Sequence, residues 1–187
     1  MKRQEFRDWL AGVDPRRLVF LDETGAKTNM IRLYGRARKG ERVVDYAPHG
    51  HWNTTTLVAA ITWESTIAPM VLDGPMDTLS FEAYVAQVLL PVLPTSAIVV
   101  MDNLSAHKSQ TTQKLFREAG IQLRYQPPYS PDFNPIELMW AKVKNSLRSA
   151  KARTQEQLYT AIAHALTQIS SNDTQGFFRH CNVGIIT

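Results

Sequence analysis

The stretch Tyr125-Gln-Pro-Pro-Tyr-Ser-Pro-Asp-Phe-Asn-Pro-Ile-Glu-Leu-Met-Trp140 decides how the rest of the chain is interpreted. Its four prolines fix the backbone φ angle repeatedly and remove hydrogen-bond donors, so this stretch forms neither a strand nor the middle of a helix. Asn134-Pro135 is typical of a helix start, with asparagine as the N-cap and proline at the first helical position. Glu137 then falls on the third helical position. We therefore predict a stiff arm that presents one carboxylate on the first turn of a helix.

Two other segments each place an aspartate directly after four apolar residues, Leu18-Val-Phe-Leu-Asp22 and Ile98-Val-Val-Met-Asp102. Continuous apolar runs of this length predict strands that are buried on both faces of a sheet. If the two strands are parallel neighbours, Asp22 and Asp102 emerge at the same edge, where open α/β sheets keep their sites. The segment between Asp102 and Glu137 has room for one helix, one strand and the arm. We predict that these three carboxylates share divalent metal.

Each carboxylate also has a purely structural interpretation. Asp22 can simply end a strand, with Glu23 pointing to the opposite face. Asp102 is followed by an asparagine, and both residues favour turns. Glu137 has the sharpest alternative, because with Asn134 as the cap it occupies the position of a capping-box glutamate. The catalytic interpretation rests on the joint occurrence of the three residues with the proline arm.

The predicted ligands indicate which metal would bind. Carboxylate oxygens without clustered cysteine or histidine favour Mg²⁺ or Mn²⁺ over zinc. Two such ions about 3.5–4 Å apart can hold the attacking and the leaving oxygen of an in-line phosphoryl displacement. Three carboxylates suffice if one of them, which we expect to be Asp22, bridges both ions.

These motifs resemble those of the mariner-like transposases, the DDE superfamily, and are most similar to the bacterial insertion-sequence branch. The resemblance rests on four segments and covers the chain from about residue 6 to about residue 180. The segments are Phe20-Leu-Asp-Glu-Thr-Gly25, Ala47-Pro-His-Gly-His-Trp52, Met101-Asp-Asn103 with His107 beyond it, and Pro127-Pro-Tyr-Ser-Pro-Asp-Phe-Asn-Pro-Ile-Glu137.

The resemblance implies a fold and an activity. The fold is α/β and ribonuclease H-like, a mixed five-stranded sheet flanked by helices. The activity is metal-dependent hydrolysis of phosphodiester bonds at transposon ends, followed by transfer of the freed 3′-hydroxyl into target DNA. Asp22, Asp102 and Glu137 would be the catalytic and metal-binding residues. The partners would be double-stranded DNA at the transposon ends and the target, and a second copy of the chain in a homodimer.

Four further residues are candidates for DNA contacts. Asn103 and His107 match family positions beside the second aspartate, and either orient the substrate or order the loop. Lys144 and Arg148 lie on the helical stripe of Glu137 and could bind phosphates, with a solvated basic face as the alternative. Other basic residues are expected to be solvated: Lys142, Lys151 and Arg153. A zinc site built on His49 and His51 is disfavoured because further ligands are missing.

The domain organisation is also inferred from the resemblance. Family members normally carry N-terminal helix-turn-helix modules, and nothing before Arg16 is long enough for one. We expect residues 1–14 to be the remnant of a linker helix and residues 15–187 to be the catalytic domain. The chain would be an excised domain or a second reading frame, with its helix-turn-helix half encoded separately.

Composition sets wider bounds on the protein. The chain has 187 residues, 44% of them hydrophobic, with a net charge of +4, which is compatible with a polyanionic partner. Its single cysteine, Cys181, excludes an internal disulfide and suits a reducing cytosol. The longest apolar stretch, residues 84–101, is interrupted by a glutamine and two prolines, which argues against a membrane span. We expect a cytoplasmic, nucleoid-associated bacterial protein.

Hydrophobic periodicity predicts the order of the elements. The predicted helices cover residues 1–13, 77–90, 106–119, 135–148 and 154–169, with a weaker one around residues 177–178. The predicted strands cover residues 17–23, 41–46, 54–62, 97–102 and 121–125, and the first three are expected to form an antiparallel meander.

Two other functions remain open at this level. A ribonuclease H-like nuclease would share the acidic triad but cut DNA without strand transfer. A non-catalytic remnant that binds DNA or a full-length transposase would need none of the chemistry, although an intact triad argues against decay.

Overall fold

A mixed five-stranded sheet forms the centre of the protein in the computed structural model, which describes residues 2–49 and 54–183. The strands lie in the order β3-β2-β1-β4-β5. β1 (Leu18–Ala26) pairs antiparallel with β2 (Thr55–Ile61), which pairs antiparallel with β3 (Thr66–Asp73). On its other side β1 pairs parallel with β4 (Ile98–Met101), and β4 pairs parallel with β5 (Gln122–Tyr125). The predicted parallel neighbours are therefore confirmed.

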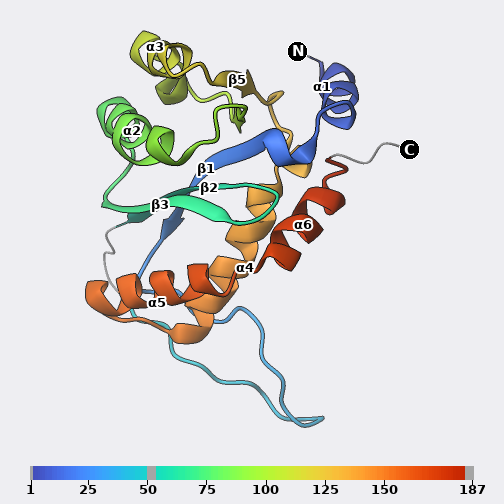
Figure 1. Cartoon of the computed structure of the whole chain (residues 1–187). Coiled ribbons are helices and arrows are strands. Elements are labelled where there is room, and N and C mark those ends of the chain that lie inside the picture. The colour runs from blue at the N-terminus through green and yellow to red at the C-terminus, as the bar shows by residue number, and fades with distance from the viewer. Residues whose placement is uncertain (1, 50–53, 184–187) are drawn as a thin grey trace.

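Helices cover both faces of the sheet (Figure 1). α4 (Pro135–Ala150), α5 (Gln155–Thr167) and α6 (Ser171–His180) pack on one face, together with α1 (Arg3–Ala11). α2 (Thr78–Tyr84) and α3 (Gln110–Glu118) pack on the other, and α2 continues as a π-helical turn through Leu89. In the described part of the chain, no helix is long and apolar enough to cross a membrane.

Alternation along β1 divides the core into these two layers. Leu18 and Phe20 belong to the layer under α4, whereas Val19 and Leu21 belong to the layer under α2. Because successive strand residues point to opposite faces, the next residue, Asp22, falls on the α4 side. The same alternation in β4 places Val100 on the α4 side, so Asp102 should follow it there.

The predicted strand over residues 41–46 is wrong. Residues 27–49 form no strand but a long loop that reaches past the C-terminal end of α4 (Figure 1). The third strand of the meander is instead β3, which the sequence prediction missed and which follows β2 after a tight turn, where Thr62 N–H donates to Ser65 O. β3 contains Pro69, and proline is tolerated in a strand at the edge of a sheet because no neighbour needs its missing N–H.

The loop over residues 27–49 is tied to α4 and the segment after it. Lys151 Nζ lies 2.6 Å from Asp45 Oδ2, and Arg153 Nη1 donates to the carbonyl of Thr28 at 2.9 Å. Lys142 forms an ion pair with Asp173 at 2.6 Å. The three basic residues expected to be solvated therefore have structural partners.

The helix signals differ in accuracy. Thr154 and Gln157 form the predicted capping box at the start of α5, and Gly120 adopts a left-handed φ of 70° after α3. α4 begins at Pro135 as predicted, but the side chain of Asn134 makes no capping hydrogen bond with the residues that the structure describes. Asn134 is therefore the N-cap residue as predicted, but it caps through its backbone carbonyl, which accepts from the Glu137 N–H.

The proline arm is held against the fold by α1. Gln126 N–H at its start donates to the Met101 carbonyl at 2.9 Å, which places it beside β4. Arg3 then donates to Ser130 Oγ at 2.7 Å, pairs with both carboxylate oxygens of Asp132, and stacks 4.7 Å from the centre of the Phe133 ring. A planar guanidinium can make all these contacts at once, whereas a lysine ammonium cannot.

We predict that Arg3→Lys loosens the arm without unfolding the protein. The amides of Phe133 and Asn134, which donate to Ser130 and Pro131 carbonyls, should exchange with solvent about 5–10-fold faster. The thermal midpoint should change little, because exposed ion pairs contribute little to stability. Lys114→Ala, which removes the exposed pair with Glu118, is the control and should leave arm exchange unchanged. Unaltered exchange in Arg3→Lys would show that the prolines alone order the arm.

Candidate active site

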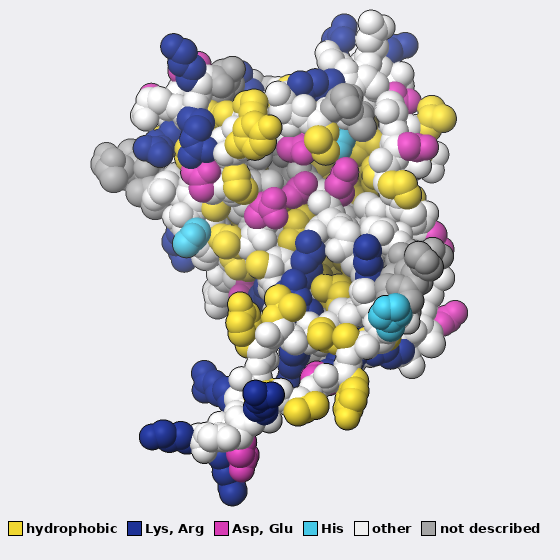
Figure 2. Space-filling view, turned by 180° about the vertical axis from the view of Figure 1, so that it is seen from behind, with side chains coloured by type: hydrophobic (Ala, Val, Ile, Leu, Met, Phe, Trp, Pro, Cys, Tyr) yellow, Lys and Arg dark blue, Asp and Glu magenta, His cyan; other side chains and the backbone are white. Residues whose placement is uncertain are grey.

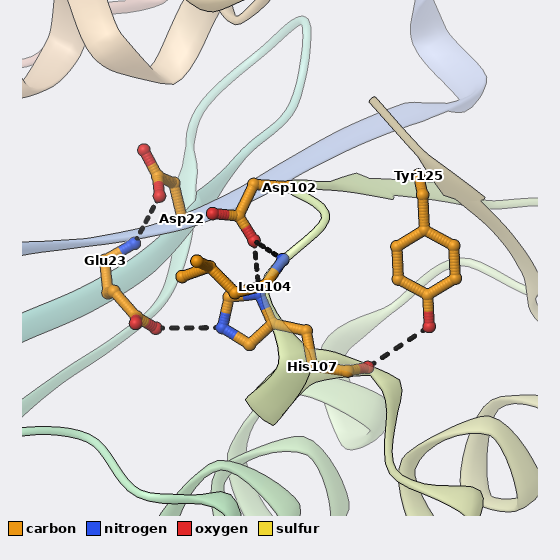
Figure 3. Close-up of polar contacts among 6 residues, drawn as sticks. All are labelled: Asp22, Glu23, Asp102, Leu104, His107 and Tyr125. Carbon is orange, nitrogen blue, oxygen red and sulfur yellow. Dashed lines mark hydrogen bonds and ion pairs between the residues drawn. The ribbon is translucent and has the colours of Figure 1, made fainter. Parts of the chain in front are cut away.

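Asp22 and Asp102 lie side by side at the edge of the sheet. The parallel register pairs Phe20 with Val100, and each aspartate stands two residues beyond its member of that pair. Figure 3 shows both side chains leaving adjacent strands at this edge. The backbone N–H of Glu23 donates to Asp22 Oδ1 at 2.8 Å, and that of Leu104 donates to Asp102 Oδ1 at 3.1 Å. The local backbone thus holds each carboxylate in place.

Glu137 completes the wall of the cavity above this edge. The cavity measures about 430 Å³ and is bounded by the three predicted carboxylates, the loop after β4 and the proline arm. α4 has no capping box, so the alternative interpretation of Glu137 as a capping-box glutamate does not hold. The Glu137 N–H donates to the Asn134 carbonyl, while the exposed side chain lines the cavity. The residues that line it are Asp22, Asp102, Asn103, Leu104, Gln126, Pro127, Pro128, Tyr129, Ser130, Pro131, Asn134 and Glu137.

A buried histidine links Asp102 to a carboxylate on the opposite face of β1. His107 Nδ1 lies 2.6 Å from Asp102 Oδ1, and its Nε2 lies 3.1 Å from Glu23 Oε2 (Figure 3). The ring stacks on Phe81 with centroids 4.2 Å apart, and its side chain is 1% exposed. Tyr125 holds the same turn by donating its hydroxyl to the His107 carbonyl at 3.1 Å. His107 is therefore fixed from three sides.

The pKa values of these groups reflect this arrangement. Burial lowers the pKa of His107, but its hydrogen bonds to Asp102 and Glu23 outweigh that effect and raise it to about 9. The imidazole is thus a cation at neutral pH and can donate from both nitrogens. Burial acts to raise the pKa of Asp102, yet the hydrogen bonds from His107 and the Leu104 N–H lower it overall.

Asp22 has the opposite balance. Burial raises its pKa to about 7, and the charges of Glu137 and Asp102 add to that effect. The hydrogen bond from the Glu23 N–H only partly offsets them. Without a cation in the cavity, Asp22 is therefore close to half protonated at neutral pH.

The ligand atoms of the cavity are of the right chemical type for a hard divalent cation, but the carboxylates lie too far apart to hold one. Carboxylate oxygens are the ligands that Mg²⁺ and Mn²⁺ prefer, and three carboxylates line this cavity. Within residues 2–49 and 54–183, however, no three His, Cys, Asp or Glu side chains converge closely enough to hold one ion. A bound cation would have to draw the three carboxylates together.

The other predicted site residues are placed differently. Asn103 is exposed and lines the cavity, whereas the burial of His107 does not fit the predicted DNA contact. Lys144 is half-buried on α4. Arg148 lines a second cavity of about 410 Å³, where the loop residues Arg32 and Tyr34 face the end of α4. Of the residues in the disfavoured zinc fragment, His51 lies outside the described residues.

Sequence reasoning missed two members of the site. Glu23 was expected only to face away from Asp22, and the turn that brings His107 to it depends on the packing of α2 against that segment. Gln126 was treated as part of the arm, but its side chain is buried and lines the cavity. One feature of the sequence could have indicated Gln126: it is a polar residue directly before the two prolines of the arm motif.

Charge is segregated on the face that carries the cavity. Figure 2 shows acidic side chains gathered near the middle of this face, with Lys and Arg side chains below them and along the protruding loop. The basic residues of that loop are Lys27, Arg32, Arg36, Arg38, Lys39 and Arg42.

Comparisons with known proteins agree with this arrangement. A family model described as DDE superfamily endonuclease matches residues 17–159. The Tcb1 transposase of Caenorhabditis briggsae is 26% identical over 124 residues, which cover 64% of this chain and 45% of that protein. An uncharacterized 39 kDa protein of insertion element IS630 from Shigella sonnei is 30% identical over 74 residues, 38% of this chain and 22% of that protein. The chain thus spans less than half the length of these curated relatives.

The structural comparison addresses the fold. A crystal structure of the Mos1 mariner paired end complex with Mn superimposes with a TM-score of 0.79 and 15% identity, over 96% of this chain and 58% of that one. The predicted ribonuclease H-like fold, with its mixed five-stranded sheet flanked by helices, is confirmed.

We predict that Asp22→Asn stabilises the metal-free protein at pH 8 by about 2 kcal/mol, half of the full linkage value because the cavity opens to water. An acid whose pKa is raised by folding loses stability as the pH climbs from 3.8, its ordinary value, to about 7. The gain should therefore fade as the pH is lowered towards 4. Denaturant unfolding in EDTA at both pH values measures it, and added Mn²⁺ should stabilise only the unsubstituted protein.

Asp173→Asn is the control of opposite sign. Hydrogen bonds from Lys142 and Ser170 lower the pKa of Asp173 to about 2. In the unsubstituted protein this carboxylate therefore contributes stability above pH 3.8 that is lost as the pH falls towards 2. Asp173→Asn should destabilise the protein at pH 8. An Asp22→Asn protein that is no more stable than the original at pH 8 would show that the cavity does not strain this carboxylate.

Proposed function

This chain belongs to the DDE superfamily endonucleases, and on that premise we propose that it is the catalytic domain of a mariner-like transposase of the bacterial insertion-sequence type. Its substrates would be double-stranded transposon ends and target DNA. The single observation that carries the proposal is the cavity at the sheet edge, where Asp22, Asp102 and Glu137 arrive from two strands and a helix. The printed name of the Tcb1 relative, a transposase, supports it.

The proposed chemistry has two successive displacements at phosphorus. In the first, a water oxygen attacks a phosphodiester at the transposon end, the P–O bond to the neighbouring nucleotide breaks, and a free 3′-hydroxyl results. In the second, that 3′-oxygen attacks a phosphodiester of the target, and the target's own 3′-oxygen leaves with a proton. No covalent bond to the protein forms in either step.

Asp22, Asp102 and Glu137 would bind two Mg²⁺ or Mn²⁺ ions, with Asp22 bridging them. When bound, such ions supply charge stabilisation at the phosphoryl oxygens and lower the pKa of the attacking water. The Mos1 mariner paired end complex was crystallised with Mn, which supports divalent metal here. Loss of the proton from Asp22 would accompany binding, because a cation in the cavity removes the cause of its raised pKa.

His107 would act through Asp102 rather than on DNA. By occupying Asp102 Oδ1, it leaves the other carboxylate oxygen to face the cavity. Its second hydrogen bond, to Glu23, keeps the ring protonated and prevents it from turning. We therefore assign His107 and Glu23 as positioning residues, and keep Asn103, Lys144 and Arg148 as DNA contacts.

The proposed partners follow from the substrate. Basic side chains along α4 and the loop over residues 27–49 lie on the face of the acidic cavity, where a DNA backbone would cross (Figure 2). A homodimer would bring two transposon ends together, in keeping with the paired end complex of Mos1. Recognition of end sequences would come from a helix-turn-helix half encoded separately, and the assembly would act on the nucleoid in the bacterial cytoplasm.

Two assays test the proposed function. Incubation with supercoiled plasmid and Mn²⁺ should give nicked and linear DNA, and EDTA should abolish both products. Incubation with an oligonucleotide that ends in a 3′-hydroxyl should also give joined products. Cleavage without joining would identify a nuclease, and binding without cleavage would identify a non-catalytic remnant.

We predict that Glu137→Gln lowers metal-dependent cleavage by at least about 100-fold while the protein remains folded. Glutamine keeps the size and hydrogen-bonding capacity of the side chain but is a poor, uncharged ligand. Plasmid cleavage and thermal unfolding measure the two effects. Glu118→Gln, an exposed substitution on α3, is the control and should cleave normally. Full cleavage by Glu137→Gln would remove this residue from the catalytic set.

We predict that Lys144→Ala and Arg148→Ala each reduce the salt dependence of DNA binding. Each lost phosphate contact should lower the slope of log K against log salt by about 1, because one fewer counterion is released. Fluorescence anisotropy with a duplex in Ca²⁺ measures the slope. Lys142→Ala is the matched control on the same helix, since its ammonium already pairs with Asp173. Unchanged slopes in both variants would show that Lys144 and Arg148 do not contact DNA and form only a solvated basic face.

A further inference from the structure

Tyr129 is an exposed aromatic residue in a conformation that aromatic residues rarely adopt. Its side chain is 98% exposed, and its backbone φ is 53°. The left-handed region is strained for a bulky residue and is normally occupied by glycine or asparagine. The residue also lines the cavity that holds Asp22, Asp102 and Glu137. A strained backbone that holds a large ring in water beside an active-site cavity indicates a functional role.

The surrounding contacts fix this conformation. Arg3 Nη1 donates to the Tyr129 carbonyl at 3.2 Å and to Ser130 Oγ at 2.7 Å. The Ser130 hydroxyl in turn donates to the Pro128 carbonyl at 3.1 Å. Proline on the N-terminal side and these hydrogen bonds on the C-terminal side leave the backbone little freedom. The ring itself is held by none of them and remains available for stacking.

Two buried amides line the same cavity without partners. Gln126 is 6% exposed and Asn134 4% exposed, and none of the described residues hydrogen-bonds to Gln126 Nε2 or Asn134 Oδ1. Buried side-chain amides are normally satisfied, and an unsatisfied one needs an explanation. Both atoms are closed off from solvent in the free protein, so a ligand with hydrogen-bond donors and acceptors would satisfy them once the two side chains turn towards the cavity. A nucleotide has both on its base edge and sugar.

We propose that the proline arm is a nucleotide-binding wall, in which Tyr129 stacks on a base next to the cleaved bond and Gln126 and Asn134 hydrogen-bond to the same nucleotide. The proposal rests on the proposed function, because the carboxylates define which phosphate lies in the cavity. A base can reach the ring only after it leaves the duplex stack, so the substrate at this step is a locally unpaired nucleotide. Stacking on tyrosine tolerates any base, because every base has a π-face.

The test compares two DNAs and several variants at Tyr129. One DNA is a duplex with a short single-stranded tail, and the other carries abasic residues throughout that tail. Binding is measured by anisotropy in Ca²⁺ with the full chain. Tyr129→Asn keeps a residue that accepts the left-handed backbone but removes the ring, and Tyr129→Phe and Tyr129→Trp keep a ring.

We expect Tyr129→Asn to bind the normal tail about 5- to 100-fold more weakly, because base–aromatic stacking contributes about 1–3 kcal/mol. It should bind the abasic tail as well as the unsubstituted protein does. Tyr129→Phe and Tyr129→Trp should bind the normal tail within about threefold of it. Tyr129→Asn should also unfold at the same or a higher temperature, since the strain is relieved. Leu79→Asn, at an exposed apolar residue outside the cavity, is the control and should change neither affinity.

Equal losses on both DNAs, or no loss on either, would overturn the proposal, because the ring would then not act through a base. A lower unfolding temperature in Tyr129→Asn would show that the ring supports the fold instead. Plasmid cleavage by the unsubstituted protein in Mn²⁺ is measured alongside. If cleavage is absent while the base-dependent loss is seen, the proposed catalytic function fails and the nucleotide-binding wall stands.

Discussion

One constraint governs this structure: several carboxylates lie around one partly buried cavity, which is electrostatically unfavourable. Burial favours the uncharged form of Asp22 there, and the nearby charges of Glu137 and Asp102 add to that effect. The protein meets only part of this cost itself. His107 neutralises Asp102 and Glu23 from below the cavity, whereas Asp22 is left with a pKa of about 7. A cation bound in the cavity would offset this cost.

Rigid elements are needed because repelling groups would otherwise move apart. Asp22 lies within β1 and Asp102 directly follows β4, and the register of these strands is fixed by hydrogen bonds and by burial on both faces. Glu137 has no such neighbour, and its position depends on where α4 begins. The proline arm sets that start, and the arm in turn is held by β4 at one end and by Arg3 at the other. A helix far away in the sequence thus helps to place the carboxylate of Glu137.

The sequence predicted the parts of this arrangement that depend on local pattern. The buried strands before Asp22 and Asp102, and the helix start before Glu137, carry signals in the identity of a few adjacent residues. The third strand was misplaced for two reasons. Residues 41–46 include β-branched residues but have no neighbouring strand to pair with, and β3 contains a proline, which argues against a strand in the sequence. The link from His107 to Glu23 could not be predicted either, since it joins residues from distant segments across the sheet.

Several features that break local rules lie around the same cavity. Asp22 is buried with a raised pKa, Tyr129 is strained, and the amides of Gln126 and Asn134 lack partners among the described residues. Natural proteins tolerate such violations at functional sites, where a ligand removes the cost when it binds. A cation would relieve Asp22, and an unpaired nucleotide would satisfy the amides and cover the exposed ring. The two ligands would therefore complete one site, in which each of these unfavourable features of the free protein would become a contact in the complex.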